Sequence, residues 1–227
     1  MLNLDIKYSV EKDAETYVNF VYQFKALEHG RINPQKELLE RLDPELQTIL
    51  ANTKDEKSAY TDVLVYLTKK NDENPQLIKN SIKTLEDRWN AVGNQIIYSL
   101  EFLYKKPFPF EKVTLYLTTN NICPYSYEDR YFFANYRYAS EQMDVAKHEL
   151  NHFMFYFYYE SLRNKLDLEK YELLKESLTL FSSPNQTGKP NEGPIREFFK
   201  TKLWADLDDA ILAGCEFLTS TTFPNNK

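Results

Sequence analysis

Two of the three histidines in the chain lie four residues apart, in the pentapeptide HELNH at residues 148–152. On an α-helix, residues at this spacing share one face about one turn apart, so both imidazoles can bind one metal ion. Neutral imidazole is a good ligand for Zn²⁺. Glu149 projects about 100° around the helix from His148, where its carboxylate can accept a proton from a zinc-bound water whose pKa the metal lowers to about 7. The pentapeptide therefore predicts a zinc site at His148 and His152, with Glu149 as the general base.

The residues that flank this pentapeptide extend the pattern. Val145 stands three residues before the first histidine, an apolar residue, Met154, follows the second, and no proline interrupts the segment. Uncharged residues stand at Ala146, Leu150, Asn151 and Phe153. Together these positions resemble the extended signature of the zincin metallopeptidases, and the resemblance covers about residues 110–181. It implies a peptidase with one Zn²⁺ ion per chain and a peptide or protein substrate.

A catalytic zinc site needs three protein ligands and a water, so a third ligand must come from outside the pentapeptide. In the metzincin class, HExxHxxGxxH supplies it, but this chain has Phe155 at the glycine position and Tyr158 at the last histidine position. Gluzincins use a glutamate on the next helix. The segment Leu173 to Phe181 resembles the gluzincin pattern of two apolar residues before the glutamate, then a small, an apolar and a small residue, and an aromatic at the end.

The gluzincin resemblance implies Glu176 as the third metal ligand, 24 residues after His152. Its main competitor is Glu172, which follows His152 by 20 residues and would leave Glu176 one helical turn further on. Two more glutamates, Glu169 and Glu160, are weaker candidates. For each of the four glutamates taken alone, an exposed helix face is the more common place.

Other classes of protein share part of this pattern. Glu149-x-x-His152 is also the ExxH of ferritin-like di-iron bundles, but such a site needs two copies, and His29, the third histidine, has Ala26 at the matching position. The same letters also fit a histidine pair in a helical scaffold that binds no metal. A third alternative is a catalytically idle zincin-like binding or regulatory protein that retains a structural or vestigial zinc site.

Hydrophobic periodicity predicts the elements that must position these residues. A region of unassigned family, residues 1–106, is expected to be helical, and Lys106–Pro109 breaks the pattern before a zincin-like domain, residues 107–227. The expected fold is α+β and predominantly helical, with a short mixed sheet, an active-site helix and a glutamate helix. The expected helices are Asp13–His29, Lys36–Asn52, Asp55–Lys70, Gln76–Lys105, Glu141–Arg163, Leu168–Phe181 and Ile195–Leu218.

Two segments rich in β-branched and aromatic residues are expected to be strands, Val113–Thr118 and Arg130–Tyr138. In zincins the strand before the active-site helix tends to be an edge strand that pairs with an extended substrate, and Arg130–Tyr138 occupies that place. Its tyrosines, Tyr131, Tyr136 and Tyr138, are candidate donors to an oxyanion.

Composition excludes several classes of function. The chain has 227 residues and a net charge of −6, without the basic face that nucleic-acid binding needs. No apolar run is long enough to span a membrane, and Met1–Ala14 lacks the apolar core of a secretory signal. Five glycines and no GxGxxG or GxxxxGK[ST] argue against phosphate-binding loops. With two cysteines, Cys123 and Cys215, a reducing, cytoplasmic location is expected.

Overall fold

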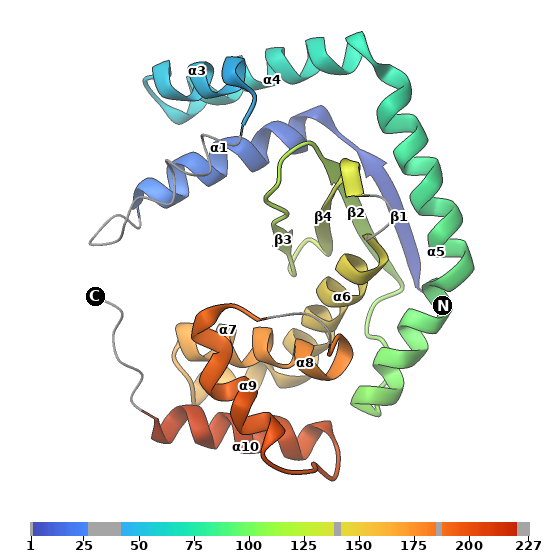
Figure 1. Ribbon diagram of the computed structural model, residues 1–227, viewed down its shortest axis with the longest axis vertical. Helices are drawn as coiled ribbons and strands as arrows, with labels where there is room; N and C mark the ends of the chain where they lie inside the picture. The colour runs from blue at the N-terminus through green and yellow to red at the C-terminus, as the bar shows by residue number, and fades with distance from the viewer. Residues whose placement is uncertain (1, 27–41, 139–141, 185–187, 222–227) are drawn as a thin grey trace. The chain divides into compact units, whose positions relative to one another are not determined.

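The computed structural model describes residues 2–26, 42–138, 142–184 and 188–221. Helices make up most of this part of the chain, and one small mixed sheet accompanies them (Figure 1). The predominantly helical α+β fold expected from the sequence is confirmed. His29 and the proposed helix start at Glu141 lie outside the described residues.

The sheet has four strands in the order β1-β2-β4-β3. Their bounds are β1 Asn3–Tyr8, β2 Lys112–Thr118, β3 Tyr125–Ser126 and β4 Tyr131–Asn135. β4 runs parallel to β2, with Leu115 opposite Phe132, and β3 runs antiparallel to β4. Val113, Leu115 and Leu117 alternate along β2 and are fully buried, as expected for a strand with one face on the core.

Two predictions about the sheet are wrong. The first strand, Asn3–Tyr8, lies in the region expected to be all helical; its alternation of buried Leu4 and Ile6 with more exposed neighbours is a strand period, but the segment is short. Arg130–Tyr138 is not an edge strand, because β4 lies between β2 and β3. The chain turns back through Tyr125 and Ser126, which pair with Phe132 and Tyr131.

In the first part of the chain, the helices expected at Asp55–Lys70 and Gln76–Lys105 are close to those observed. The helix expected from Lys36 begins only at Pro44 in the described residues, because proline suits the first position of a helix and not its interior; residues 27–41 lie outside the described part of the chain. The bounds of the observed helices are α1 Val10–Ala26, α3 Pro44–Asn52, α4 Glu56–Glu73 and α5 Pro75–Tyr104. The side chains of Asp43 and Asp55 cap α3 and α4 by accepting hydrogen bonds from backbone N–H groups in the first turn. α1 packs along α4 (Figure 1), and their shared core includes Ala14, Val18 and Val63.

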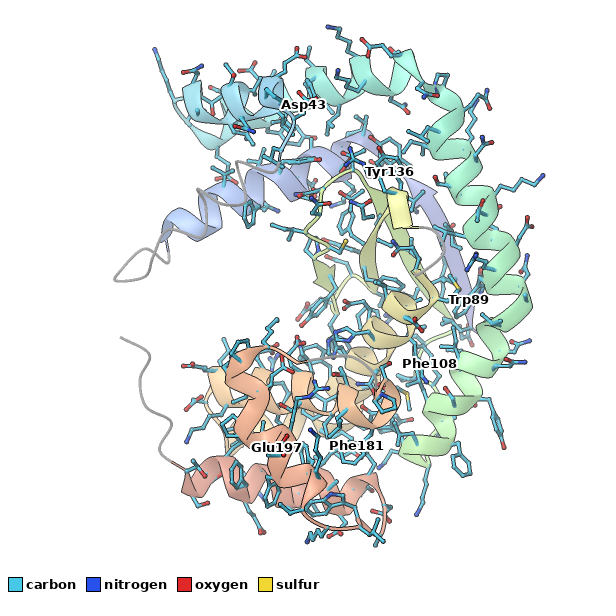
Figure 2. All side chains as sticks on the ribbon, in the orientation of Figure 1. Asp43, Trp89, Phe108, Tyr136, Phe181 and Glu197 are labelled. Atoms are coloured by element: carbon cyan, nitrogen blue, oxygen red, sulfur yellow. The ribbon has the colours of Figure 1, made fainter. Side chains whose placement is uncertain are left out.

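The C-terminal part of the chain is a group of shorter helices. Their bounds are α6 Gln142–Tyr159, α7 Leu168–Ser177, α8 Thr179–Ser182, α9 Gly193–Lys200 and α10 Leu207–Ser220, with 3₁₀ turns at Tyr136–Tyr138, Glu160–Asn164 and Pro190–Glu192. Phe181 lies on α8 (Figure 2). The centroid of its ring is 5.3 Å from that of Phe199 on α9. A Cβ at Gly214 of α10 would lie 2.8 Å from Phe199 and 2.9 Å from Leu174, so α10 packs closely on α9 and α7.

Two of the expected C-terminal helices are interrupted. Leu168–Phe181 breaks at Leu178, between α7 and α8. Ile195–Leu218 breaks between α9 and α10, where the Trp204 indole donates to the Phe199 carbonyl at 2.7 Å and Asp206 caps the second helix. Aromatic packing and a new helix cap thus override the continuous periodicity of the sequence.

The chain forms two compact units, each assembled from separated segments. Unit 1 contains Met1–Leu4, Arg88–Val113 and Met143–Asn225, and unit 2 contains Asp5–Asp87, Thr114–Gln142 and Asn226–Lys227. Both units draw on residues from each side of the division expected between residues 106 and 107, and that division stays a prediction. In the described ranges, no helix has the length and apolar character to cross a membrane.

A buried carboxylate, Asp13, connects α1 to the end of β2 inside unit 2. Its two oxygens accept hydrogen bonds from the Tyr8 and Thr118 hydroxyls and from the hydroxyl and backbone N–H of Thr119, at 2.5–3.1 Å. Asp13 is fully buried. Since four donors converge on one side chain, removal of the carboxylate leaves several buried groups without a partner.

We therefore expect Asp13→Ala to lower the free energy of unfolding by roughly 2–3 kcal/mol, measured by urea denaturation. Glu15→Ala, on the same helix, removes only a half-exposed carboxylate paired with Lys12, and we expect its effect to stay within about 0.5 kcal/mol. Equal effects of the two substitutions would contradict the anchoring role of Asp13.

Candidate metal centre

The two histidines of the pentapeptide face the same side of α6. His148 Nε2 and His152 Nε2 lie 2.9 Å apart. The side chain of His152 is 1% exposed and that of His148 is 24% exposed, so solvent reaches the pair mainly at His148. Tyr104 fixes this stretch of α6, because its hydroxyl donates to the backbone carbonyl and side-chain oxygen of Asn151.

The carboxylate of Glu176 reaches the same point from α7. Its Oε2 lies 3.7 Å from His148 Nε2, and its Oε1 lies 3.6 Å from His152 Nε2. Donor atoms about 2.0–2.1 Å from a tetrahedral zinc ion are separated by roughly 3.3 Å. The three observed separations, 2.9, 3.6 and 3.7 Å, bracket that value.

These three side chains form the one group of three or more metal-ligating residues found within the described ranges. Two imidazoles and one carboxylate are a donor set that suits Zn²⁺ in a catalytic site. The residues present therefore fit a zinc ion in both chemistry and spacing.

The other candidate glutamates lie elsewhere. Glu172 accepts hydrogen bonds from the Tyr156 hydroxyl at 2.8 and 2.9 Å and from Lys175 Nζ at 2.8 Å. Glu160 and Glu169 are exposed to solvent. Of the four glutamates weighed from the sequence, the structure brings only Glu176 to the histidine pair.

Burial and charge set the protonation states at this centre. Burial, with the positive charge of Lys175, holds the pKa of His152 well below its usual range, so its imidazole is neutral at pH 7. Burial alone would raise the pKa of Glu176, but Lys175 and Lys189 lower it, and the group is ionised. Neutral imidazole and ionised carboxylate are the forms that bind metal.

Glu149 is buried beside this group, with 8% of its surface exposed. Its Oε2 has no hydrogen-bond partner within the described part of the chain. Burial raises the pKa of Glu149 to about 8, against the opposing charge of Lys175 and with a further contribution from Glu176. A carboxyl group with such a pKa is largely protonated at pH 7 in the metal-free protein, and a pKa this far from the ordinary value is typical of functional sites.

Lys175 is the residue at this centre that the sequence did not reveal. Its side chain is 1% exposed, and its ammonium lies 3.1 Å from Glu176 Oε1. Burial would lower its pKa, but Glu176, Tyr156 and Glu172 raise it above the ordinary value, so it is charged. In the sequence it is one lysine among many, and its only signal is the apolar neighbours Leu173 and Leu174.

The tyrosines proposed as oxyanion donors belong to unit 2. The Tyr131 ring packs edge-on against Tyr116 and Phe133, with centroids 5.6 Å apart in each pair. The Tyr136 hydroxyl accepts a hydrogen bond from Arg137 Nε. The side chain of Tyr138 is outside the described part of the chain.

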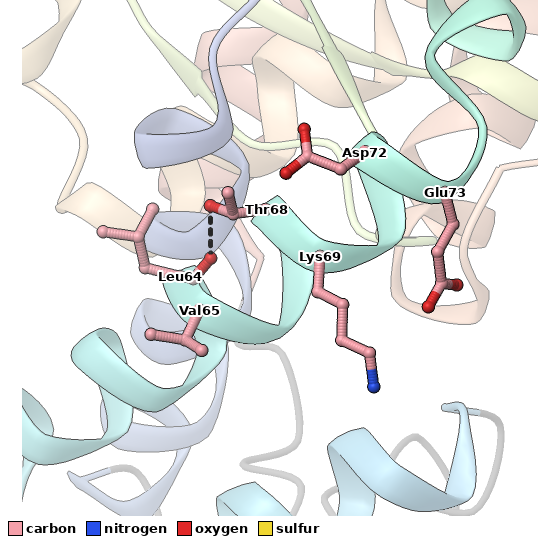
Figure 3. Close-up of a pocket in the computed structure, with 6 residues that line it drawn as sticks. All are labelled: Leu64, Val65, Thr68, Lys69, Asp72 and Glu73. Atoms are coloured by element: carbon pink, nitrogen blue, oxygen red, sulfur yellow. Dashed lines mark hydrogen bonds between the residues drawn. The ribbon is translucent and has the colours of Figure 1, made fainter.

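A separate concavity on α4 does not contain the candidate metal-binding residues. Six residues of that one helix line it: Leu64, Val65, Thr68, Lys69, Asp72 and Glu73 (Figure 3). The Thr68 hydroxyl is occupied by a hydrogen bond to the Leu64 carbonyl. None of the three metal-ligating side chains lines it, so the candidate site is the group on α6 and α7.

Comparison with protein-family models, with curated proteins and with solved structures finds no match to this chain. Interpretation of the centre therefore depends on its own residues and geometry.

We expect purified protein loaded with zinc and then desalted to retain about one equivalent per chain, measured by plasma mass spectrometry. His148→Ala, His152→Ala and Glu176→Ala each remove one of three ligands and should lose the metal. Glu169→Ala, an exposed glutamate on α7, should retain it. Retention of zinc by Glu176→Ala would exclude Glu176 as the third ligand.

The free energy of unfolding of the metal-free protein, prepared with a chelator, should depend on pH. The pKa of Glu149 rises from 4.5 to about 8 on folding, so folding favours its protonated form and the stability this gives is lost as pH rises towards 8. His152, with its lowered pKa, destabilises the fold only below about pH 6.5, where it protonates in the unfolded chain. Between about pH 6.5 and 8 we expect the wild-type free energy of unfolding to fall relative to Glu149→Gln, by up to about 1.4 kcal/mol per pH unit. Parallel urea-denaturation curves across this range would contradict the burial of an ionisable Glu149.

Proposed function

We propose that the chain is a zinc-dependent peptidase in which His148, His152 and Glu176 hold the ion and Glu149 is the general base. The observation that carries the proposal is the buried Oε2 of Glu149, which lacks a hydrogen-bond partner among the described residues. An unpaired buried carboxylate oxygen costs about 1–3 kcal/mol, and such groups call for a functional explanation. A water molecule on a metal ion held by the adjacent histidine pair would donate a hydrogen bond to this oxygen, and this would explain why the described part of the chain offers it no partner.

Each residue then has a defined part in hydrolysis. A bound zinc ion would polarise the peptide carbonyl and supply hydroxide near neutral pH. Glu149 accepts the proton of the attacking water at its carboxylate and passes it to the nitrogen of the leaving amine. The imidazoles of His148 and His152 and the ionised Glu176 would hold the ion, and a substrate would reach it past the more exposed His148.

The proposed partner is a peptide or protein. The net charge of −6 does not favour nucleic acid, and no membrane partner is proposed. A cytoplasmic location belongs to the same proposal, in line with the low cysteine content.

A catalytically idle zincin-like binding or regulatory protein, with a structural or vestigial zinc site, is the alternative. A structural zinc site is normally closed by four protein ligands, whereas a catalytic one has three and an open position. The described residues supply three ligands, and this count favours the peptidase over a structural site.

The test is Glu149→Gln, a substitution close in size that cannot accept the proton. We expect it to retain one zinc per chain and to lose peptide hydrolysis by about 10²–10⁴-fold. Hydrolysis is followed by mass spectrometry of a mixed peptide library, which detects cleavage at any of the many sequences that the library contains.

Glu169→Gln is the matched control and should cleave the library as the wild type does. Cleavage by Glu149→Gln at the wild-type rate would rule out the assigned base. A zinc-loaded wild type that produces no new peptide termini would instead favour the idle protein.

A further inference from the structure

Lys175 places a buried positive charge directly on the third ligand of the candidate centre. Its Nζ lies 3.1 Å from Glu176 Oε1, 2.8 Å from Glu172 Oε2 and 3.2 Å from the Tyr156 hydroxyl. The side chain is 1% exposed. A buried ammonium is costly unless it is paired and hydrogen-bonded, and here three oxygens contact it.

We propose that Lys175 is an internal counter-ion of the metal centre, which holds the Glu176 carboxylate in place before metal binds and weakens the affinity of the finished site. The inference concerns metal binding alone, and it rests on the three-ligand site of the proposed function. Lys175 acts through Glu176, so it is a positioning residue.

The first part of the argument is the cost of the metal-free site. Glu176 and Glu172 are acidic groups one turn apart on α7, with side chains 21% and 34% exposed. Like charges in a poorly hydrated region repel one another. The ammonium of Lys175 contacts both carboxylates and offsets their charge, so Glu176 keeps its position without a metal ion.

The second part is competition for one carboxylate. A zinc ion bound to Glu176 would lie about 2 Å from one of its carboxylate oxygens. Lys175 Nζ lies 3.1 Å from Oε1 of the same carboxylate. Two cations that share one carboxylate repel strongly in a poorly hydrated site. Hydrogen-bond partners that raise metal affinity are those that make a ligand more basic, and a cation has the opposite effect on a carboxylate.

Glu172 moderates this repulsion. Its carboxylate pairs with Lys175 and also accepts from Tyr156, which lies one turn after His152 on α6. Glu172 thus draws the ammonium away from Glu176 while it is kept from the metal by its own partners. The balance between the two glutamates sets how much of the Lys175 charge the ion experiences.

The experiment measures zinc dissociation constants by chelator competition. We expect Lys175→Met, which retains most of the length of the side chain but not its charge, to bind zinc at least tenfold more tightly than wild type, while its metal-free form unfolds at lower urea concentration. Lys175→Arg retains the positive charge and should bind zinc with wild-type affinity. Lys170→Met, at a partly exposed position of the same helix, is the matched control. A residue with only a structural role would lower stability in Lys175→Met without tightening zinc binding.

A second variant keeps the test decisive if metal-free Lys175→Met does not fold. Glu172→Gln, at a half-exposed side chain, leaves the Lys175 charge on Glu176 alone and should weaken zinc binding several-fold. Unchanged affinity in Glu172→Gln, or unchanged or weaker affinity in Lys175→Met, would overturn the counter-ion role. Wild-type protein that binds no zinc would overturn the metal centre itself, and an inactive protein that shows the expected affinities would overturn only the peptidase.

Discussion

The structure of unit 1 depends on balancing charge where α6 and α7 meet. Glu149 and His152 are buried on α6, and Glu176 and Lys175 arrive from α7. Acidic groups in such a place cost free energy unless a cation accompanies them. The position of α7 against α6 is therefore fixed by charge as well as by apolar packing, and a shift of α7 by one turn would bring Glu172 to the histidines in place of Glu176.

Hydrogen bonds from two tyrosines around the centre make the register of α7 against α6 specific. The Tyr104 hydroxyl on α5 donates to Asn151 in the pentapeptide, and the Tyr156 hydroxyl on α6 donates to Glu172 on α7. Both tyrosine rings are buried, so each brings apolar packing and a directed hydrogen bond together. These contacts restrain the helices that carry the three candidate ligands, which is the support that a precise metal site would need.

The sequence was sufficient for the parts of the site that depend on one helix. His148 and His152 share a face, with Glu149 beside it, because of helical geometry alone, and the glutamate pattern predicts Glu176. Lys175 could not be predicted, because its burial depends on where α7 meets α6. Strand β1 is not predictable for a similar reason, since it pairs with β2, which is distant in sequence. The break at Trp204 is local instead: the Trp204 indole bonds to the Phe199 carbonyl and Asp206 caps α10, and Asp206 is the sequence signal for it.

The same charge balance bears on how Glu149 could act as a base. Burial raises its pKa to about 8, so without a metal ion it is largely protonated at neutral pH and cannot accept a proton. A dication at the neighbouring histidines would stabilise the ionised carboxylate and lower that pKa. Metal binding would then create the base and the nucleophile together, and the metal-free protein would be inactive for two linked reasons. Lys175 has the same effect in a weaker form, because its positive charge already lowers the pKa of Glu149 while burial raises it.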